Sequence, residues 1–462
     1  MHLIVESRVP VLTGSAIPPA VILAAGEGRR LNGVNRGSLK PLTPFLGLTL
    51  LERAILSCKE VGIIEFYVVI GYHSHIIVPY LKALEQRLSV LIQPVENPNW
   101  REGNGSSALS VSPYIRRSFF LLMCDHIFDP DILRLLLTEG LNTTDCLLAV
   151  DRHAERVFDL SDATKVKLDG NIIIGIGKEK ASFDAVDTGL FLCHPSLFNA
   201  LEVARRKGQH SLSAGLVELI SNREFRAVTI GKRFWFDVDT PKSLGRAKRA
   251  LLQSLSKPDE DGFVSCYLNR PASRRISEIL VRTPISPNVI SLLSFAVSIM
   301  GALMFGLGGY SWTILAGLII QLSSIVDGCD GEVARIRFQS SRFGGWFDTI
   351  LDRYADIAIV GGISFGFWLT HPHVSVWFGA IFSLTGFIMA SYVKKEFVIR
   401  YQSKLPDGVF GKLIKRDLRI FAIMLGATVN LPYEIMLLMG FLSHAGIGWM
   451  LLRGYRQTRS IA

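Results

Sequence analysis

Four aspartates lie within a hydrophobic part of the chain that is long enough to cross a membrane. Asp327 and Asp330 are three residues apart, and Asp348 and Asp352 are four apart. On helices, the members of each pair project from one face. Acids at membrane depth are costly, so they are functional by default. Two acidic faces that meet would offer the oxygen ligands of Mg²⁺ or Mn²⁺, which predicts a metal site in a membrane domain.

A second group of residues suited to chemistry follows the first strand-like run. Small residues after a buried strand let backbone N–H groups approach phosphates, which Arg29 and Lys40 can neutralise. Asp125 closes the run FFLLMCD, and Asp239 is the second aspartate of WFDVDTP. A bare glycine turn would equally suit an ordinary strand-to-helix connection. The candidate nucleotide-binding residues are Leu23, Ala24, Ala25, Gly26 and Gly28.

The composition indicates a soluble part joined to a membrane part. Of 462 residues, 49% are hydrophobic and 19% are charged, and the formal net charge is +10. Such a charge suits nucleic acid, anionic lipid or phosphorylated substrates. Lys and Arg gather on one side of the expected membrane helices and form no stripe with aromatic residues, so no nucleic-acid partner is expected. The six cysteines show no metal-ligand spacing and are expected to be free thiols.

Residues 18–250 are expected to form a Rossmann-like α/β domain that positions the candidate phosphate-binding residues. Strand-like runs alternate with helical segments, which predicts a layered domain with a mostly parallel sheet. Residues 1–17 are an N-terminal extension, and turn-forming residues around KPDEDG mark a linker at 251–275. The expected strands are AVILAAG, EFYVVIG, SVLIQ, FFLLMCD, CLLAV and FRAVTI.

Residues 276–455 are expected to form an all-α domain of six transmembrane helices that positions the four aspartates. Several apolar segments approach the spanning length of about 20 residues, but the fifth is short and contains Arg419. Basic residues occupy alternate loops, which places both termini, including the tail at 456–462, and both sites in the cytoplasm of a cell-membrane protein. The segments are 288–306, 311–333, 345–369, 374–393, 418–431 and 434–452.

The combination of LAAGEGRRL with KPL resembles the nucleotidyltransferases that join a nucleoside triphosphate to a sugar or alcohol phosphate. The resemblance implies catalytic roles for Arg29 and Lys40, and Mg²⁺ binding by Asp125 and Asp239. For Asp125, a strand-end cap is the alternative. The loop that would read a pyrimidine contains Asn104, Gly105 and Ser106. The implied second-substrate residues are Lys178, Glu179, Lys180 and Asp187.

The membrane aspartates belong to a longer pattern that matches the signature of CDP-alcohol phosphotransferases. The pattern is Asp327-x-x-Asp330-Gly331-x-x-Ala334-Arg335, eight residues, then Gly344-x-x-x-Asp348-x-x-x-Asp352. The resemblance implies that the first three aspartates bind metal on the CDP pyrophosphate. Asp352 would approach the metal and act as general base. The implied nucleotide contacts are Gly331, Ala334, Arg335 and Gly344.

Charged residues near this pattern leave two interpretations open. Asp356 lies one turn after Asp352 and would orient Arg353 or a substrate, or make structural hydrogen bonds. The basic run before the fifth segment would anchor the helix at the cytoplasmic side or form a cationic pocket for a phosphorylated acceptor. The run contains Lys412, Lys415, Arg416 and Arg419.

The two halves together resemble the family of bifunctional inositol-1-phosphate cytidylyltransferases and di-myo-inositol phosphate phosphate synthases. In that family, CTP and inositol-1-phosphate give CDP-inositol, which transfers its phosphoinositol to a second inositol-1-phosphate. The resemblance implies Mg²⁺ or Mn²⁺ at both sites, surrounding membrane lipid and a homodimer. One alternative is a phosphotransferase of phospholipid synthesis that uses CDP-diacylglycerol or another CDP-polyol, with a soluble domain that activates a different sugar or polyol phosphate. A non-enzymatic transporter or receptor is hard to reconcile with intact acids in both motifs.

Overall fold

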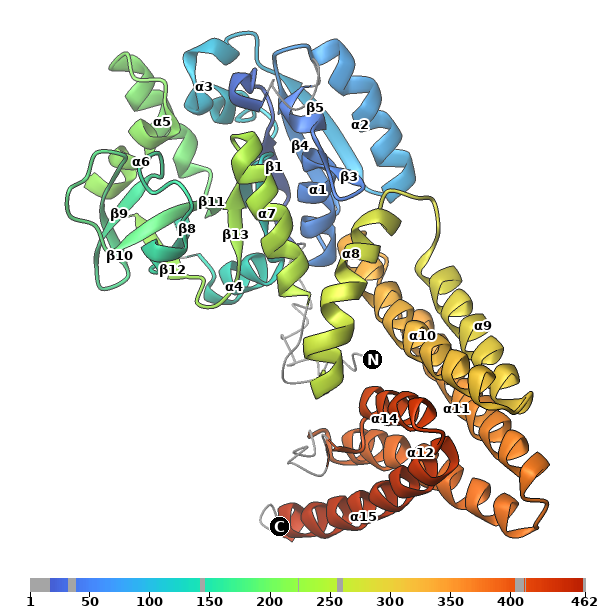
Figure 1. The fold of residues 1–462 in the computed structure, drawn as a ribbon. Helices are drawn as coiled ribbons and strands as arrows, with labels where there is room; N and C mark the ends of the chain where they lie inside the picture. Colours follow the sequence, from blue (N-terminus) through green and yellow to red (C-terminus); the bar gives the residue numbers. More distant parts are fainter. Residues whose placement is uncertain are drawn as a thin grey trace. The chain divides into compact units, whose positions relative to one another are not determined.

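The computed structural model describes residues 17–31, 39–141, 146–222, 224–255, 261–403, 411 and 413–459. It contains two compact units, Arg8–Leu251 and a unit with Leu252–Ala462, and each is described by itself (Figure 1). The expected N-terminal extension, apart from Ile17, lies outside the described residues, as do Lys412 and the side chain of Arg29.

The first unit is built on a sheet of nine strands. These are β1 (Ala20–Leu23), β4 (Glu65–Ile70), β5 (Leu91–Glu96), β6 (Phe119–Met123), β8 (Cys146–Asp151), β9 (Lys165–Asp169), β10 (Ile172–Gly177), β11 (Ala185–Cys193) and β12 (Phe225–Thr229). Their order is β5-β4-β1-β6-β11-β8-β12-β10-β9. All six strands expected from the sequence are present, and the α/β prediction is confirmed.

The expectation of a mostly parallel sheet holds for only part of it. Strands β5, β4, β1 and β6 run parallel, and β12 runs parallel to β8. Strand β11 is antiparallel to both β6 and β8, and the hairpin of β9 and β10 is also antiparallel. Because β11 has strands on both sides, it is almost continuously buried, like a parallel strand. Its apolar pattern therefore did not reveal its direction.

Helices cover both faces of the sheet (Figure 1). One core contains residues of α1 (Leu50–Glu60), α2 (Ser74–Leu88) and α4 (Asp131–Glu139). The other contains residues of α3 (Asn104–Leu109), α5 (Ser196–Arg206) and α6 (Leu212–Ser221). Successive residues of β1 alternate between the two cores, as the two-residue period of a strand requires. Strand β7 (His126–Phe128) pairs with β13 (Trp235–Asp237) in a separate short sheet, and helix α7 (Pro241–Ser254) follows β13.

The second unit is helical among its described residues. Its helices are α8 (Arg270–Leu280), α9 (Pro287–Gly306), α10 (Tyr310–Ile336), α11 (Arg342–Thr370), α12 (Ser375–Tyr401), α14 (Arg416–Thr428) and α15 (Pro432–Arg459). Each of the six expected apolar segments falls on one of these helices. In the described part, four helices are long and apolar enough to cross a membrane, namely α9, α10, α12 and α15. Helix α11 contains several charged residues, and α14 has only 13 residues.

Helical structure also enters the expected linker at 251–275. Helix α7 ends at Ser254, and a π-helical turn at Ser265–Asn269 leads directly into α8. Small residues set the packing in the membrane unit. A Cβ atom on Gly362 or Gly366 of α11 would overlap backbone carbonyl groups of α9, so these two helices approach closely, as small residues permit.

Candidate active sites

Three of the four membrane aspartates come together between α10 and α11. Asp327, Asp348 and Asp352 present carboxylate oxygens that all lie within 4.8 Å of one another. Asp330 is outside this group of three. Its carboxylate accepts hydrogen bonds from Ser291 Oγ, at 2.5 Å, and from the backbone N–H of Gly331. The structure therefore offers three carboxylates as a ready oxygen cluster and gives the fourth a hydrogen-bonded position beside α9.

Arg416, at the start of α14, reaches this carboxylate cluster. Its Nη1 atom lies 2.6 Å from Asp352 Oδ1 and 3.5 Å from Asp327 Oδ2. Arg419 is 3% exposed and lies over the ring of Phe387. Both arginines therefore contact side chains of other helices in this unit.

Asp356 binds arginines from two helices. Its carboxylate lies 3.0 Å from Arg353 Nη1, 3.2 Å from Arg416 Nε and 3.5 Å from Arg419 Nη2. Asp356 therefore contacts Arg353, and it also contacts both arginines of α14. Because Arg416 bridges Asp356 and Asp352, Asp356 helps to set the position of the cation beside the cluster.

The expected nucleotide contacts lie around the same part of α10 and the start of α11. A Cβ atom on Gly331 would lie 3.2 Å from Arg335 Nη1, and one on Gly344 would lie 3.1 Å from Ser341 Oγ. Both glycine positions thus have little free space beside the helix backbone. Arg335 Nε is buried and has no hydrogen-bond partner in the part of the chain that the structure describes. Ala334 is half-buried.

Glu332 is a buried residue of the motif that sequence reasoning missed. It is 0% exposed and lies 3.1 Å from Arg270 Nη1. The hydroxyls of Ser273 and Ser277 each donate to its carboxylate at 2.7 Å. The sequence features that could have revealed it are a glutamate within an apolar helix and two serines four residues apart on α8. This network fastens α8 to α10 beside the aspartates.

In the first unit, Lys40 joins the two aspartates that were expected to bind metal. Its ammonium group makes ion pairs with both Asp125 and Asp239. Burial opposes the charge on Lys40, but the two carboxylates raise its pKa above the usual range. Burial would raise the pKa of Asp125, yet Lys40 and His126 hold it below the usual range. Lys40 and Asp125 are therefore both charged at neutral pH.

The small residues after β1 line a cavity of about 520 Å³ together with Lys40. Leu23, Ala25, Gly26 and Gly28 are among the lining residues. Gly28 has a φ of +65°, and a Cβ atom there would overlap the side chain of Lys40. A glycine is therefore required where the lysine crosses the turn.

The loop expected to read the base is fixed to the segment before α6. Asn104 Oδ1 accepts a hydrogen bond of 2.8 Å from the backbone N–H of Leu212. The backbone N–H of Ser106 donates to His210 O at 3.2 Å, and a Cβ atom on Gly105 would lie 2.6 Å from the same oxygen. These contacts hold the loop close to the cavity, whose lining includes Asn104 and Trp100.

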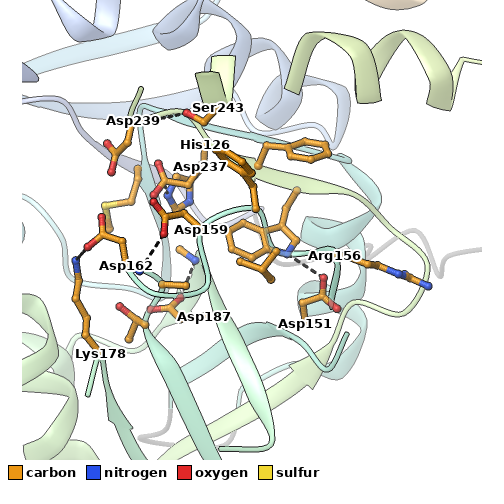
Figure 2. Close-up of a pocket in the computed structure, with 18 of the residues that line it drawn as sticks. His126, Asp151, Arg156, Asp159, Asp162, Lys178, Asp187, Asp237, Asp239 and Ser243 are labelled. Carbon is orange, nitrogen blue, oxygen red and sulfur yellow. Dashed lines mark hydrogen bonds and ion pairs between the residues drawn. The ribbon is translucent and has the colours of Figure 1, made fainter. Parts of the chain in front are cut away.

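A second cavity of about 330 Å³ contains part of the expected second-substrate group (Figure 2). Lys178 and Asp187 line it, whereas Glu179 and Lys180 line neither of the two cavities. Lys178 Nζ lies 2.5 Å from Asp162, which also pairs with Arg30 at 2.7 Å. Burial raises the pKa of Asp187 to about 6.

The two cavities share several lining residues, so they meet beside Lys40 and its partner aspartates. The shared residues are Arg30, Asn104, Met123, His126 and Asp239. Arg30 and His126, together with Asp162 and Asp237, were not identified from the sequence. Their signal was weak, because Arg30 directly follows the expected Arg29, and His126 and Asp237 each lie close to an aspartate already chosen. A nucleotide and a second substrate could meet at this junction.

Both halves match models of known transferase families. Residues 20–225 match the MobA-like NTP transferase domain, and residues 284–448 match the CDP-alcohol phosphatidyltransferase family. Together with the two sites, these matches define a multifunctional enzyme, a nucleotidyltransferase joined to a CDP-alcohol phosphotransferase.

Relatives with the same two-part organisation identify the family. A bifunctional IPC transferase and DIPP synthase of Rubrobacter xylanophilus is 35% identical over 438 residues, 94% of this chain and 95% of the relative. That of Archaeoglobus fulgidus is 33% identical over 88% of this chain and 77% of its own. The solved inositol-1-phosphate CTP transferase from T. maritima is 25% identical and covers 51% of this chain and 95% of its own, with a TM-score of 0.46. The chain belongs to the family of bifunctional IPC transferases and DIPP synthases.

Proposed function

We propose that this chain catalyses two consecutive reactions. The first joins CTP and inositol-1-phosphate into CDP-inositol and releases pyrophosphate. The second transfers phosphoinositol from CDP-inositol to another inositol-1-phosphate and releases CMP. The observation that carries the proposal is the presence, on one chain of this family, of both the Lys40 site between two aspartates and the aspartate cluster with Arg416.

In the first reaction, a phosphate oxygen of inositol-1-phosphate attacks the α-phosphorus of CTP, and the bond to pyrophosphate breaks. The glycine-rich turn after β1 approaches the triphosphate with its backbone N–H groups. Lys40 compensates the negative charge of the phosphates, and its two aspartates hold the ammonium group in place. Lys178 and Asp187 lie in the neighbouring cavity, where they bind the inositol phosphate.

In the second reaction, a hydroxyl of the acceptor attacks the phosphorus that carries inositol, and the bond to CMP breaks. Asp352 accepts the hydroxyl proton. Arg416 orients Asp352 through the 2.6 Å contact and adds positive charge beside the phosphates. Arg419 and the other basic residues of this region, Lys412 among them, favour a phosphorylated acceptor.

Both sites suit Mg²⁺ or Mn²⁺. The carboxylates of Asp327, Asp348 and Asp352 supply hard oxygen donors within 4.8 Å of one another. Asp330 is one helical turn from Asp327 and completes the acidic face of α10. When bound, a divalent ion neutralises the pyrophosphate and the leaving group.

We place the second unit in the cell membrane with six embedded helices. Four are long and apolar enough to span it, and α14, with 13 residues, is the shortest of the six. The basic loops put both termini and both sites in the cytoplasm. A homodimer surrounded by membrane lipid completes this proposal by family resemblance.

Product identification tests the substrate assignment. The full chain in detergent is incubated with CTP, Mg²⁺ and either inositol-1-phosphate or glycerol-3-phosphate, and the products are separated by ion-exchange chromatography. The proposal expects CDP-inositol and a phosphodiester with the first substrate. A radiolabelled product that partitions into organic solvent when CDP-diacylglycerol is supplied would favour the phospholipid alternative, which the two-part relatives support less.

A further inference from the structure

We propose that Asp125, His126 and Asp237 form a metal site of mixed nitrogen and oxygen donors, suited to Mn²⁺, Co²⁺ or Zn²⁺. The site rests on the proposed first reaction, because it lies where the two cavities meet. It differs from the pair Asp125 and Asp239 that the family resemblance implies. Figure 2 shows His126 next to Asp237 at the cavity wall.

The distances between the three side chains suit a bound ion. His126 Nε2 lies 3.8 Å from Asp125 Oδ1 and 3.8 Å from Asp237 Oδ1. One ligand atom from each residue lies within 4.8 Å of the other two. Two metal–ligand bonds of about 2.1 Å can span about 4.2 Å, so an ion fits between the imidazole and each carboxylate. The histidine is thus too far from the carboxylates for direct hydrogen bonds and close enough to share an ion with them.

The position of the imidazole proton leaves the correct nitrogen for a metal. His126 Nδ1 lies 2.8 Å from the backbone oxygen of Thr188. A carbonyl oxygen only accepts hydrogen bonds, so Nδ1 carries the hydrogen and the neutral ring has its lone pair on Nε2. Metal-binding histidines commonly donate their other N–H to a backbone carbonyl in this way. Nε2 is the atom that faces the two carboxylates.

Buried backbone holds the ring in this orientation. Thr188 is 0% exposed, and its own hydroxyl donates to Ala149 O at 2.7 Å. The next residue, Gly189, has a φ of +70°, and a Cβ atom there would overlap the ring of His126. The carbonyl that fixes Nδ1 is therefore part of a rigid strand, and Gly189 leaves the space that the ring fills.

Lys40 directs a metal toward the histidine side of Asp125. The lysine binds Asp125 Oδ2 and also Asp239, so its ammonium group connects that pair of aspartates. Asp125 Oδ1 instead faces His126. Mg²⁺ prefers oxygen ligands and retained waters, whereas an imidazole nitrogen is a ligand for divalent transition metals, with Zn²⁺ favoured over Mn²⁺. A nitrogen donor here predicts tighter binding of Mn²⁺ than of Mg²⁺.

Direct metal binding tests the proposal without turnover. The full chain carries Asp348→Asn and Asp352→Asn to weaken the membrane site, and Mn²⁺ binding is followed by electron paramagnetic resonance of the free ion, with Mg²⁺ as competitor. We expect His126→Gln to weaken Mn²⁺ binding at least 10-fold and to reduce the preference over Mg²⁺. The exposed histidine variant His153→Gln should bind as the parent does. Asp237→Asn provides a second ligand variant should His126→Gln fail to fold.

The outcomes separate the metal site from the proposed function. Mn²⁺ affinity within twofold of the parent in both folded ligand variants would overturn the metal site. CDP-inositol formation by the chain without those substitutions is measured separately. If that product is absent while His126→Gln still loses Mn²⁺, the first reaction is rejected and the metal site stands.

Discussion

Arg416 Nη1 lies 2.6 Å from Asp352 Oδ1, so the aspartate assigned as general base is held by a cation from another helix. The same guanidinium contacts Asp327 and Asp356. Helices α10, α11 and α14 are thereby connected through one arginine at the carboxylate cluster. The second reaction should depend strongly on this residue.

Arg416→Gln removes the positive charge from the cluster but keeps a polar side chain. Loss of one charged group that stabilises a transition state typically reduces the rate by about 10²- to 10³-fold, and we expect a decrease of this size in the second reaction. CDP-inositol should accumulate, because Lys40 and its partners are unchanged. Chromatography of CDP-inositol and the phosphodiester over time measures both steps. Arg400→Gln, which removes an exposed pair with Glu396, is the control, and equal losses in the two variants would contradict the role of Arg416.

Glu332→Gln should destabilise the second unit. It removes the fully buried carboxylate beside Arg270, which keeps its ion pair with Asp261. The loss should therefore be about 1.5–3 kcal/mol, the usual contribution of hydrogen bonds to a charged group. Thermal unfolding of the full chain in detergent measures the effect. Glu278→Gln, near the end of α8, removes a partly exposed pair with Arg282, which lies just beyond the helix. It should change stability by about 0.5 kcal/mol or less. The network has no stabilising role if the two variants unfold at the same temperature.

Gly105→Ala should impair the first reaction. The new Cβ atom would lie 2.6 Å from the backbone of His210 and Ser211, and this backbone cannot move as a side chain could. The loop and α6 would separate, with an expected loss of about 1–3 kcal/mol of stability, as for other overpacked sites. The measurements are the initial rate of CDP-inositol formation and the melting temperature. Gly245→Ala in α7 meets no atom within 4 Å and should be tolerated. Similar rates in both variants would refute the predicted close packing.

Asp162→Asn should weaken inositol-1-phosphate binding with little effect on folding. Asp162 holds Arg30 and Lys178, whose side chains are 59% and 56% exposed. Exposed pairs contribute about 1 kcal/mol or less to stability, but both cations would lose their fixed position in the cavity. We expect KM for inositol-1-phosphate to rise about 3- to 10-fold, in line with the loss of about 1 kcal/mol of binding. An unchanged KM together with a lower melting temperature would assign Asp162 a structural role only.

The sequence predicted those parts of the fold that depend on local pattern. The six strands appear because each is a short apolar run bounded by polar or turn-forming residues. The three clustered aspartates lie on α10 and α11. The four-residue spacing of Asp348 and Asp352 puts both on the face of α11 that meets Asp327 of α10. The direction of β11 could not be predicted, since a strand between two neighbours is buried whichever way it runs.

Contacts between distant segments explain what the sequence did not reveal. Asp330 belongs to the same sequence motif as the three clustered aspartates, but its carboxylate accepts a hydrogen bond from Ser291 of another helix. For Arg416, an anchor at the cytoplasmic side and a cationic pocket were both expected, and its contact with Asp352 depends on the packing of α14. His126 was overlooked because its role depends on Thr188, 62 residues further along the chain.

The most direct test of two consecutive reactions at two sites is a time course of ³¹P NMR spectra on the full chain with CTP, inositol-1-phosphate and Mg²⁺. Asp352→Asn should form CDP-inositol and stop there. Asp125→Asn should form no CDP-inositol, yet should produce the phosphodiester when CDP-inositol is supplied. If either folded variant lost both reactions, or if both variants retained both, the assignment of one reaction to each site would be contradicted.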